Sequence, residues 1–405
     1  MKKKSILFWR KEKNDSAKEA LQNDYYETVS ANLGIFQVIL YFALFAFVVL
    51  SFFSNTRLIT YQNFYYFFKD LNASVESSEA RGSDFVTYPS NPQQSFSLYR
   101  KGLAVAGNKS VSVYTASGRQ TVSKIISYQN PTVAGTGKYL MVYEMGGSQY
   151  SLYNSYTQVY TGKTDAPILG ATVSDSGSYA LITESEEYST VVWLYDSHFS
   201  LVNRYNKNGY VMDVALDREG SRIAILTSSA EHGLFQTKLE MYEPGKSFAE
   251  AEATVGDSLG LSCAFTSSGT VSVLTGESLC FYSSGGVLKS SFPFDGRSIA
   301  DAELNGDGAA LCLSSSTLSG VSQLIAFDKN GKTVYNEIVQ NGVESLTRVG
   351  NSIYLLSYGS VQQLDIRSGK TTQISCNTDQ RKLLAVNENE ALLCSSQKAE
   401  YLRFP

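Results

Sequence analysis

A turn signature that recurs along most of the chain constrains its fold more than any other feature. In each copy, an apolar segment ending in an aromatic residue or leucine is followed by a turn of the type Asp-x-x-Gly-Lys. Clear copies run from Tyr242 to Lys246, from Phe327 to Lys332 and from Leu364 to Lys370. Glycine suits these turns because hairpins require a positive φ, which costs other residues energy. We therefore expect many short antiparallel strands.

A second turn signal lies upstream of several copies and completes the repeat. Its copies begin at Ser174, Asp217, Thr266 and Asn305. With the turns aligned, the units start near Phe96, Pro131, Ile168, Tyr210, Ser258, Ile299, Val343 and Arg381. The spacing of about 40 residues is that of a four-stranded propeller blade. We predict an all-β propeller over residues 84–405, with eight blades and with seven as the alternative.

The last unit has room for only three strands, and the start of the domain offers the fourth. The segment from Asp84 to Tyr88 reads DFVTY, which suits a short strand. We predict that it forms the outer strand of the last blade. This pairing would join the two ends of the domain and remove the exposed strand edges that invite aggregation.

The turns resemble the repeats of quinoprotein-like and WD-like β-propellers over residues 84–405. The quinoprotein pattern places a tryptophan shortly after Gly-Lys, and none follows Lys246, Lys332 or Lys370. The WD dipeptide and its Gly-His partner are also missing. The whole layout looks like an uncharacterised family of bacterial membrane-anchored propeller proteins. This resemblance implies a fold and a location, and it implies neither an activity nor a cofactor.

An uncharged run of 21 residues, Leu33 to Phe53, precedes the repeats. As a helix with a rise of 1.5 Å per residue it would be about 30 Å long, which matches the hydrocarbon core of a bilayer. It is too long for a signal peptide, and no Ala-x-Ala cleavage site follows it. We predict one transmembrane signal-anchor helix over residues 33–54, with its lipid contact through Leu33 to Phe53.

The charges around this run predict its orientation. Residues 1–32 form a tail with seven basic residues, which the positive-inside rule places in the cytoplasm, with the propeller outside. Counted only within 20 residues of the run, the two sides tie, with Lys13 and Lys18 against Arg57 and Lys69. We expect a single-pass protein of the cell membrane with an extracytoplasmic propeller.

Residues 55–83 are predicted to link the helix to the propeller. The stretch from Tyr61 to Leu71 is rich in aromatic residues, which suit a membrane surface because one end of the ring stays hydrated. The same rings would also suit packing on the propeller or a continuation of the helix, and periodicity does not separate these readings. Residues 72–83 are small and polar, as in a linker.

Residues suited to catalysis or metal binding are few. The two histidines, His198 and His232, fall in loop types that open on opposite faces of a propeller, so they are not expected to share a site. The acidic turn from Asn305 to Gly308 is read as a hairpin, because Ser314 stands where a calcium loop needs its closing glutamate. We predict no catalytic residue, no cofactor site and no metal site.

The cysteines and the net charge exclude further classes. The five cysteines are odd in number and widely spaced, so neither a zinc site nor a disulfide framework is expected. Most lie in apolar strand segments, where a thiol packs as a small hydrophobe. The net charge of −4 argues against a nucleic-acid partner, which requires a basic stripe.

Two neighbouring units carry long segments between their second and third strands, and both should project from the same face. The candidate partner-binding residues there are Glu184, Glu186, Glu187, Tyr188, Glu231, His232 and Phe235. Loops of this kind often carry function, although loops that merely tolerate insertion would look the same. Carboxylates beside aromatic rings suit a cationic or carbohydrate-bearing partner. We expect a binding or scaffolding module for an envelope protein or a cell-wall component. A propeller hydrolase or lyase acting on glycans is the alternative.

Overall fold

A computed structural model of the chain describes residue 33 and residues 36–46, 84–155, 157–231, 233–314, 321–340 and 342–405. The chain divides into two units, Met1–Phe67 and Phe68–Pro405. In the first unit, residues 36–46 form an α-helix with exposed apolar side chains. Among the described residues, no helix is both long and apolar enough to cross a membrane. The tail 1–32, the link 55–83 and much of the predicted span 33–54 lie outside the described residues.

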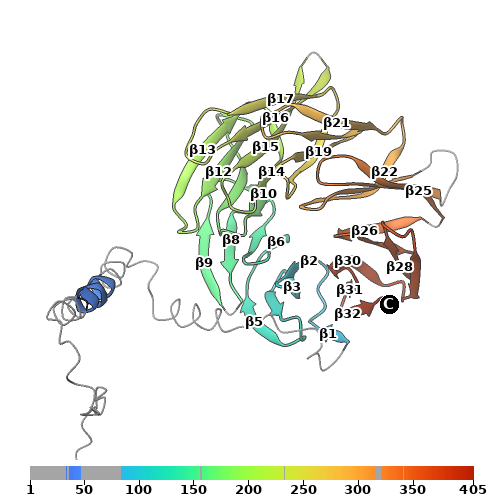
Figure 1. The fold of residues 1–405 in the computed structure, drawn as a ribbon, viewed down its shortest axis with the longest axis horizontal. Coiled ribbons are helices and arrows are strands. Elements are labelled where there is room, and N and C mark those ends of the chain that lie inside the picture. The colour runs from blue at the N-terminus through green and yellow to red at the C-terminus, as the bar shows by residue number, and fades with distance from the viewer. Residues whose placement is uncertain are drawn as a thin grey trace, which may run out of the picture. The chain divides into compact units, whose positions relative to one another are not determined.

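The second unit is a ring of eight four-stranded antiparallel sheets (Figure 1). Blades 1 and 2 contain β2 (Gln94–Tyr99), β3 (Gly102–Gly107), β4 (Ser110–Tyr114), β5 (Gln120–Ile125), β6 (Pro131–Gly135), β7 (Leu140–Glu144), β8 (Gln149–Tyr153) and β9 (Gln158–Lys163). Blades 3 and 4 contain β10 (Ile168–Val173), β11 (Tyr179–Glu184), β12 (Thr190–Tyr195), β13 (Leu201–Lys207), β14 (Tyr210–Leu216), β15 (Ile223–Glu231), β16 (Leu234–Tyr242) and β17 (Ala251–Gly256).

The remaining blades repeat this arrangement. Blades 5 and 6 contain β18 (Gly260–Phe265), β19 (Val271–Thr275), β20 (Ser278–Tyr282), β21 (Leu288–Pro293), β22 (Ser298–Asn305), β23 (Gly308–Ser314), β24 (Val321–Phe327) and β25 (Thr333–Gln340). Blades 7 and 8 contain β26 (Val343–Val349), β27 (Ser352–Ser357), β28 (Ser360–Asp365), β29 (Thr371–Ser375), β30 (Gln380–Asn387), β31 (Glu390–Ser395), β32 (Lys398–Arg403) and β1 (Phe85–Thr87). The eight-bladed prediction is confirmed, and the seven-bladed alternative is wrong.

The first strand of the domain closes the ring, as predicted. β1 pairs antiparallel with β32 as the fourth strand of blade 8, with Val86 opposite Ala399. Val86 and Tyr88 are buried in a cluster that also contains Leu103 of blade 1 and Leu392 of blade 8. The two ends of the domain are therefore held in one blade interface.

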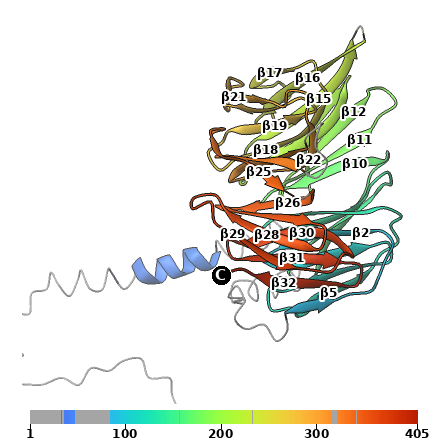
Figure 2. The ribbon, with the colours of Figure 1, turned by 90° about the vertical axis from the view of Figure 1, so that its right-hand side faces the viewer.

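The antiparallel order of the strands divides the loops between two faces of the ring (Figure 2). We call one the turn face; it carries the turns between the first and second strands and between the third and fourth strands of each blade. The other is the connection face, which carries the loops between the second and third strands and the connections from blade to blade. The described chain begins and ends on the turn face, because β1 starts there and β32 ends there.

The recurrent aspartates close turns on the turn face. Oδ1 of Asp328 accepts the backbone N–H of Asn330 and of Lys332, each at 2.9 Å, while Gly331 adopts a φ of 86°. Asp217 makes the equivalent contacts with the N–H groups of Ser221 and Arg222. One carboxylate thus satisfies backbone donors that the tight turn leaves without a strand partner. This is why a short sequence signature marks each blade.

Apolar side chains between adjacent sheets form the core. All residues of β3, β27 and β31 are buried, as expected for middle strands covered on both faces. All five cysteines are free thiols; Cys376 is half-buried, and the other four are buried. The acidic turn at 305–308 is a hairpin in which Asn305 pairs with Gly308.

Candidate functional site

The first predicted binding loop lies on the connection face of blade 3. Glu184 ends β11, and Glu184, Glu186 and Glu187 are exposed, whereas Tyr188 is half-buried. The hydroxyl of Ser185 accepts the backbone N–H groups of Glu187 and Tyr188 at 3.3 and 3.2 Å. A hydroxyl-stabilised turn therefore fixes the loop and presents its carboxylates to solvent.

The second predicted loop is largely a β-hairpin arm. β15 runs to Glu231 and β16 begins at Leu234, so the two strands continue past their neighbours in blade 4 (Figure 1). Pairing with β14 stops at Ser228, and pairing with β17 begins only at Thr237. Phe235 lies opposite Ala230 on this arm and is 49% exposed. His232 and the side chain of Glu231 lie outside the described residues.

Hydrogen bonds join the loop, the arm and the connections between blades. Ser189 Oγ donates to the Asn208 carbonyl at 2.6 Å, at the connection that leads into β14. Ser228 Oγ and Thr237 Oγ1 accept the N–H of Gly260 at 3.1 and 3.0 Å, at the connection that leads into β18. The connection face of blades 3, 4 and 5 is therefore one continuous, braced surface.

Two apolar residues of this surface were not among the predicted site residues. Tyr210, the first residue of β14, is 65% exposed, and Leu261, near the start of β18, is 39% exposed. Tyr210 lies opposite Ser228 at the base of the arm, and Leu261 follows the braced Gly260. The sequence signal that would have found them is an apolar residue directly after a blade-to-blade connection.

The loops and connections here carry charge of one sign. Residues 184–189, 208–209, 257–259 and 276–277 contain no lysine or arginine. Their exposed carboxylates are Glu184, Glu186, Glu187, Asp257 and Glu277. We call these five residues, together with Tyr188, Tyr210, Phe235 and Leu261, the acidic aromatic surface.

A buried ion pair supports this surface between blades 3 and 4. Nζ of Lys207, at the end of β13, lies 2.6 Å from Glu240 Oε2 and donates a hydrogen bond to Tyr242 Oη at 2.5 Å. Lys207 is only 8% exposed. Burial and the neighbouring Glu240 carboxylate raise the pKa of Tyr242, which therefore stays a neutral hydroxyl. The charges of Lys207 and Glu240 thus neutralise each other between the two sheets.

An acidic side chain also bridges the inner strands of blades 4 and 5. The carboxylate of Asp213 accepts the N–H of Val214 at 2.8 Å and that of Cys263 at 2.9 Å. Burial raises the pKa of Asp213 to about 6. Asp301 makes the same bridge between blades 6 and 7, through the N–H groups of Ala302 and Leu346. The recurrence of this geometry shows that these carboxylates satisfy inner-edge backbone donors.

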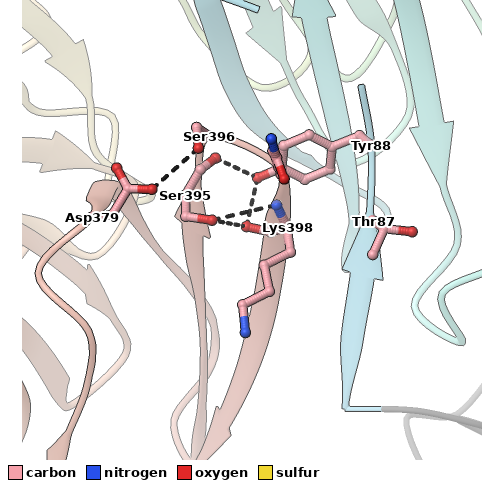
Figure 3. Close-up of a pocket in the computed structure, with 7 residues that line it drawn as sticks. Thr87, Tyr88, Asp379, Ser395, Ser396 and Lys398 are labelled. Carbon is pink, nitrogen blue, oxygen red and sulfur yellow. Dashed lines mark hydrogen bonds between the residues drawn. The ribbon is translucent and has the colours of Figure 1, made fainter. Parts of the chain in front are cut away.

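A pocket of about 370 Å³ lies where the ring closes, and Figure 3 draws the residues that line it and labels six of them. Its lining residues are Thr87, Tyr88, Asp379, Ser395, Ser396, Gln397 and Lys398. The Tyr88 hydroxyl lies 2.8 Å from the carbonyls of Ser395 and Lys398, and Ser396 Oγ donates to Asp379 at 3.1 Å. Burial raises the pKa of Tyr88, which keeps it a neutral donor. These groups hold the closing turn in place.

Of the two histidines, only His198 lies within the described residues. His198 lies in a turn on the turn face, with Nδ1 3.8 Å from Asp196 Oδ2, and its side chain is 53% exposed. His232 lies outside the described residues, so the expectation that the two histidines share no site stays a prediction. Within the described ranges, no group of three or more His, Cys, Asp or Glu side chains is placed to hold a metal ion.

Fold and surface together define an eight-bladed β-propeller with an acidic aromatic surface over three blades of one face. The chain belongs to DUF5711, a family of unknown function whose model matches residues 79–404. No curated protein sequence is significantly similar to this chain.

Several solved structures share the fold. BamB from Moraxella catarrhalis is 13% identical with a TM-score of 0.50, covering 80% of this chain and 99% of that one. The C-terminal WD40 domain of Sif2 is 13% identical with a TM-score of 0.56, covering 80% and 98%. A eukaryotic initiation factor is 14% identical with a TM-score of 0.52, covering 76% and 82%. At these identities the likeness shows the fold alone, and it agrees with the WD-like resemblance of the turns.

Proposed function

We propose that this chain is a membrane-anchored, extracytoplasmic binding module that holds a cationic segment of an envelope protein on its acidic aromatic surface. The observation that carries this proposal is the combination, on one braced surface, of exposed rings with carboxylates that make no ion pair among the described residues. Tyr210 and Phe235 are 65% and 49% exposed, and the surrounding loops hold five carboxylates without a lysine or arginine.

Each part of this surface has a distinct physical role in binding. Aromatic side chains are enriched at protein interfaces because they bury a large apolar area at a low cost in conformational entropy. Carboxylates at the rim attract a basic partner and fix its register. The hydrogen bonds that brace the loop and the arm reduce the ordering cost of binding.

The apolar helix supports the membrane anchor in this proposal. Phe36, Phe42 and Leu44 are 62%, 72% and 64% exposed in the first unit of the chain. Covering these side chains with a bilayer would lower the free energy by about 25 cal/mol for each Å² of apolar area removed from water. The uncharged run from Leu33 to Phe53 has the length that such a bilayer requires.

The test is capture of envelope proteins by the full-length chain in lipid nanodiscs, followed by affinity measurement on the protein captured. The variant Glu184→Gln/Glu186→Gln/Glu187→Gln should slow association and weaken its salt dependence. Tyr210→Ser/Phe235→Ser should weaken binding more than tenfold. Glu219→Gln/Glu337→Gln, which removes two exposed carboxylates from the turn face and an outer strand, is the control.

Two results would contradict the proposal. Retention of every captured protein by both connection-face variants would exclude the acidic aromatic surface as the binding surface. A propeller that resists protease added outside intact cells, and is cleaved after lysis, would place it in the cytoplasm. The first result bears on the surface and the second on the location, so the two parts are tested separately.

A further inference from the structure

The outer strand of blade 6 leaves an open sheet edge at the rim of the ring (Figure 1). Among the described residues, β25 is hydrogen-bonded to β24 on one side and to no strand on the other. It is the longest of the eight outer strands, with eight residues, and is about 27 Å long. An open edge presents a row of backbone N–H and C=O groups to any strand that can pair with it.

β25 lacks the features that protect the other outer strands. Proteins block open edges with short strands, charged side chains, proline or glycine. β5, β9, β13 and β21 each contain a lysine, and β17 ends in a glycine. β1 and β29 have only three and five residues. β25 reads TVYNEIVQ, without lysine, arginine, proline or glycine, so its edge is the least protected against pairing.

Apolar side chains lie beside this open edge. Val334 and Ile338 alternate with Asn336 on one side of the strand and are 42% and 68% exposed. On the other side, Tyr335 and Val339 pack against the core that blade 6 shares with blade 7. A strand added to β25 would therefore cover exposed apolar area and leave the existing core packing unchanged.

Symmetry restricts how a second copy of this strand can pair with the first. A two-fold axis perpendicular to the sheet makes the two strands antiparallel. Because side chains alternate along a strand, opposed side chains point to the same side only if the axis passes through one residue. With the axis at Asn336, Val334 lies opposite Ile338 of the second copy, and Tyr335 lies opposite Glu337 of the second copy.

The side chains favour this register over its neighbour. Only axes at Asn336 and at Glu337 oppose seven of the eight residues of the strand to residues of its copy. An axis at Glu337 would place two carboxylates directly opposite each other, which is destabilising, whereas an axis at Asn336 opposes apolar residues. Asn336 is also held in place, because its Oδ1 accepts a hydrogen bond from Gln323 Nε2 of β24 at 2.6 Å.

We propose that two copies of this chain associate through β25, with the strands antiparallel and the axis at Asn336. The inference is independent of the proposed function. Each copy covers the open edge of the other, so the assembly closes at two copies and no edge is left for further addition. Because the strands run in opposite directions, the two acidic aromatic surfaces of the dimer point to opposite sides. The contact is narrow, so the dimer dissociates on dilution.

Sedimentation of the full-length chain in nonionic detergent tests the association. We expect the protein mass in the complex to rise from one chain to two as the concentration increases. Ile338→Lys places a charge opposite Val334 twice in each dimer and should raise the dissociation constant by about tenfold or more. Ile125→Lys is the matched control, because Ile125 is 94% exposed at the end of the outer strand β5; this variant should dimerise like the unmodified chain.

Disulfide cross-linking tests the register without weakening the contact. The chain carries Cys376→Ser to remove the half-buried thiol, since the other four cysteines are buried. A mixture of Val334→Cys and Ile338→Cys chains should form a cross-linked dimer, because opposed Cα atoms lie about 4.5–5.5 Å apart, within disulfide range. Either variant alone should stay uncross-linked, since identical positions would lie about 14 Å apart. Asn336→Cys should cross-link by itself.

The outcomes that overturn the proposal are distinct. A chain that is monomeric at every concentration, or an Ile338→Lys variant that dimerises as well as Ile125→Lys, would exclude self-association through β25. Equal cross-linking in the mixture and in each single variant would exclude the register. A monomeric chain whose Ile338→Cys variant cross-links to a captured protein would assign the edge to a different partner. Partner capture by the Ile338→Lys chain should match the unmodified chain, so failure of the dimer leaves the proposed function standing.

Discussion

Replacing Lys207 with methionine should destabilise the propeller far more than removing an exposed lysine. Lys207 and Glu240 have side chains only 10% and 20% exposed, and their charged atoms lie 2.6 Å apart. Nζ also lies 4.8 Å from the centre of the Tyr242 ring. Lys207→Met keeps the apolar stem and leaves the Glu240 carboxylate with Tyr242 as its remaining partner, through a hydrogen bond of 3.0 Å.

The expected magnitude follows from the burial of this carboxylate. Breaking a fully buried ion pair by removing one partner costs about 3–5 kcal/mol. Since Glu240 retains some access to water, we expect a loss of about 2–4 kcal/mol in the free energy of unfolding. Adding Glu240→Gln removes the stranded charge, so the double variant should recover at least about 1 kcal/mol of that loss.

The assay is denaturant unfolding of the full-length chain followed by tryptophan fluorescence. Trp193 is one of two tryptophans and lies on β12 of blade 3, in the sheet to which Lys207 belongs. Lys246→Met is the matched control, because Lys246 pairs with Glu250 at side-chain exposures of 41% and 35%, and exposed pairs of this kind contribute little to stability. A Lys207→Met variant as stable as this control, or a double variant no more stable than the single one, would refute the reasoning.

Three further predictions concern the bridge, the turn and the closure. Because the folded-state pKa of Asp213 is about 6, above its ordinary value of 3.8, its stabilising contribution is present below about pH 4 and is lost as the pH rises through 6. Between pH 4 and 7.5 the free energy of unfolding of the unmodified chain should fall by up to about 3 kcal/mol more than that of Asp213→Asn. The same dependence on pH in both proteins would contradict this. Lys101→Gly should leave the free energy of unfolding unchanged or raise it by up to about 1 kcal/mol, because relief of the left-handed lysine backbone exceeds the entropic cost of glycine. A denaturation midpoint below that of the unmodified chain would contradict strain in this turn. Val86→Ala should lower the free energy of unfolding by about 2 kcal/mol, since Val86 is 4% exposed in the closing cluster. Phe85→Ala should lower it less, because Phe85 is 49% exposed. An equal loss from both variants would argue against closure through Val86.

Much of the fold could be predicted because the physical constraint on each blade is local. The turns repeat Asp and Gly at fixed offsets, where a carboxylate accepts N–H groups and glycine adopts a positive φ. These marks place the predicted start of every unit within about two residues of the observed inner strand. The closing strand could also be predicted, because the last unit lacks room for a fourth strand and only Asp84 to Tyr88 remained.

The surface chemistry was only partly predictable because it depends on which strands end together in space. Glu184, Glu186 and Glu187 could be identified as exposed because they interrupt an apolar pattern. The segment around Phe235 was predicted to be a loop, and it continues as strand because β15 and β16 pair with each other beyond their neighbours. In the sequence, Tyr210 looks like the first residue of any inner strand. Its exposure follows from the end of the pairing between β14 and β15 at Ser228.

Acidic side chains in the turns and in the blade 3 loop have different roles, which no count of charges shows. On the turn face, Asp217 and Asp328 accept backbone N–H groups within their own turns, and Asp307 and Glu388 accept the N–H groups of Gly350 and Asn351 across a blade boundary. On the connection face, the exposed carboxylates of the blade 3 loop make no ion pair within the described part of the chain. The named carboxylates of the turn face therefore stabilise the fold, whereas those of the blade 3 loop are available to a partner. Substitution of Asp217 or Asp328 should lower stability, whereas substitution of Glu184, Glu186 or Glu187 should leave stability unchanged and act on binding.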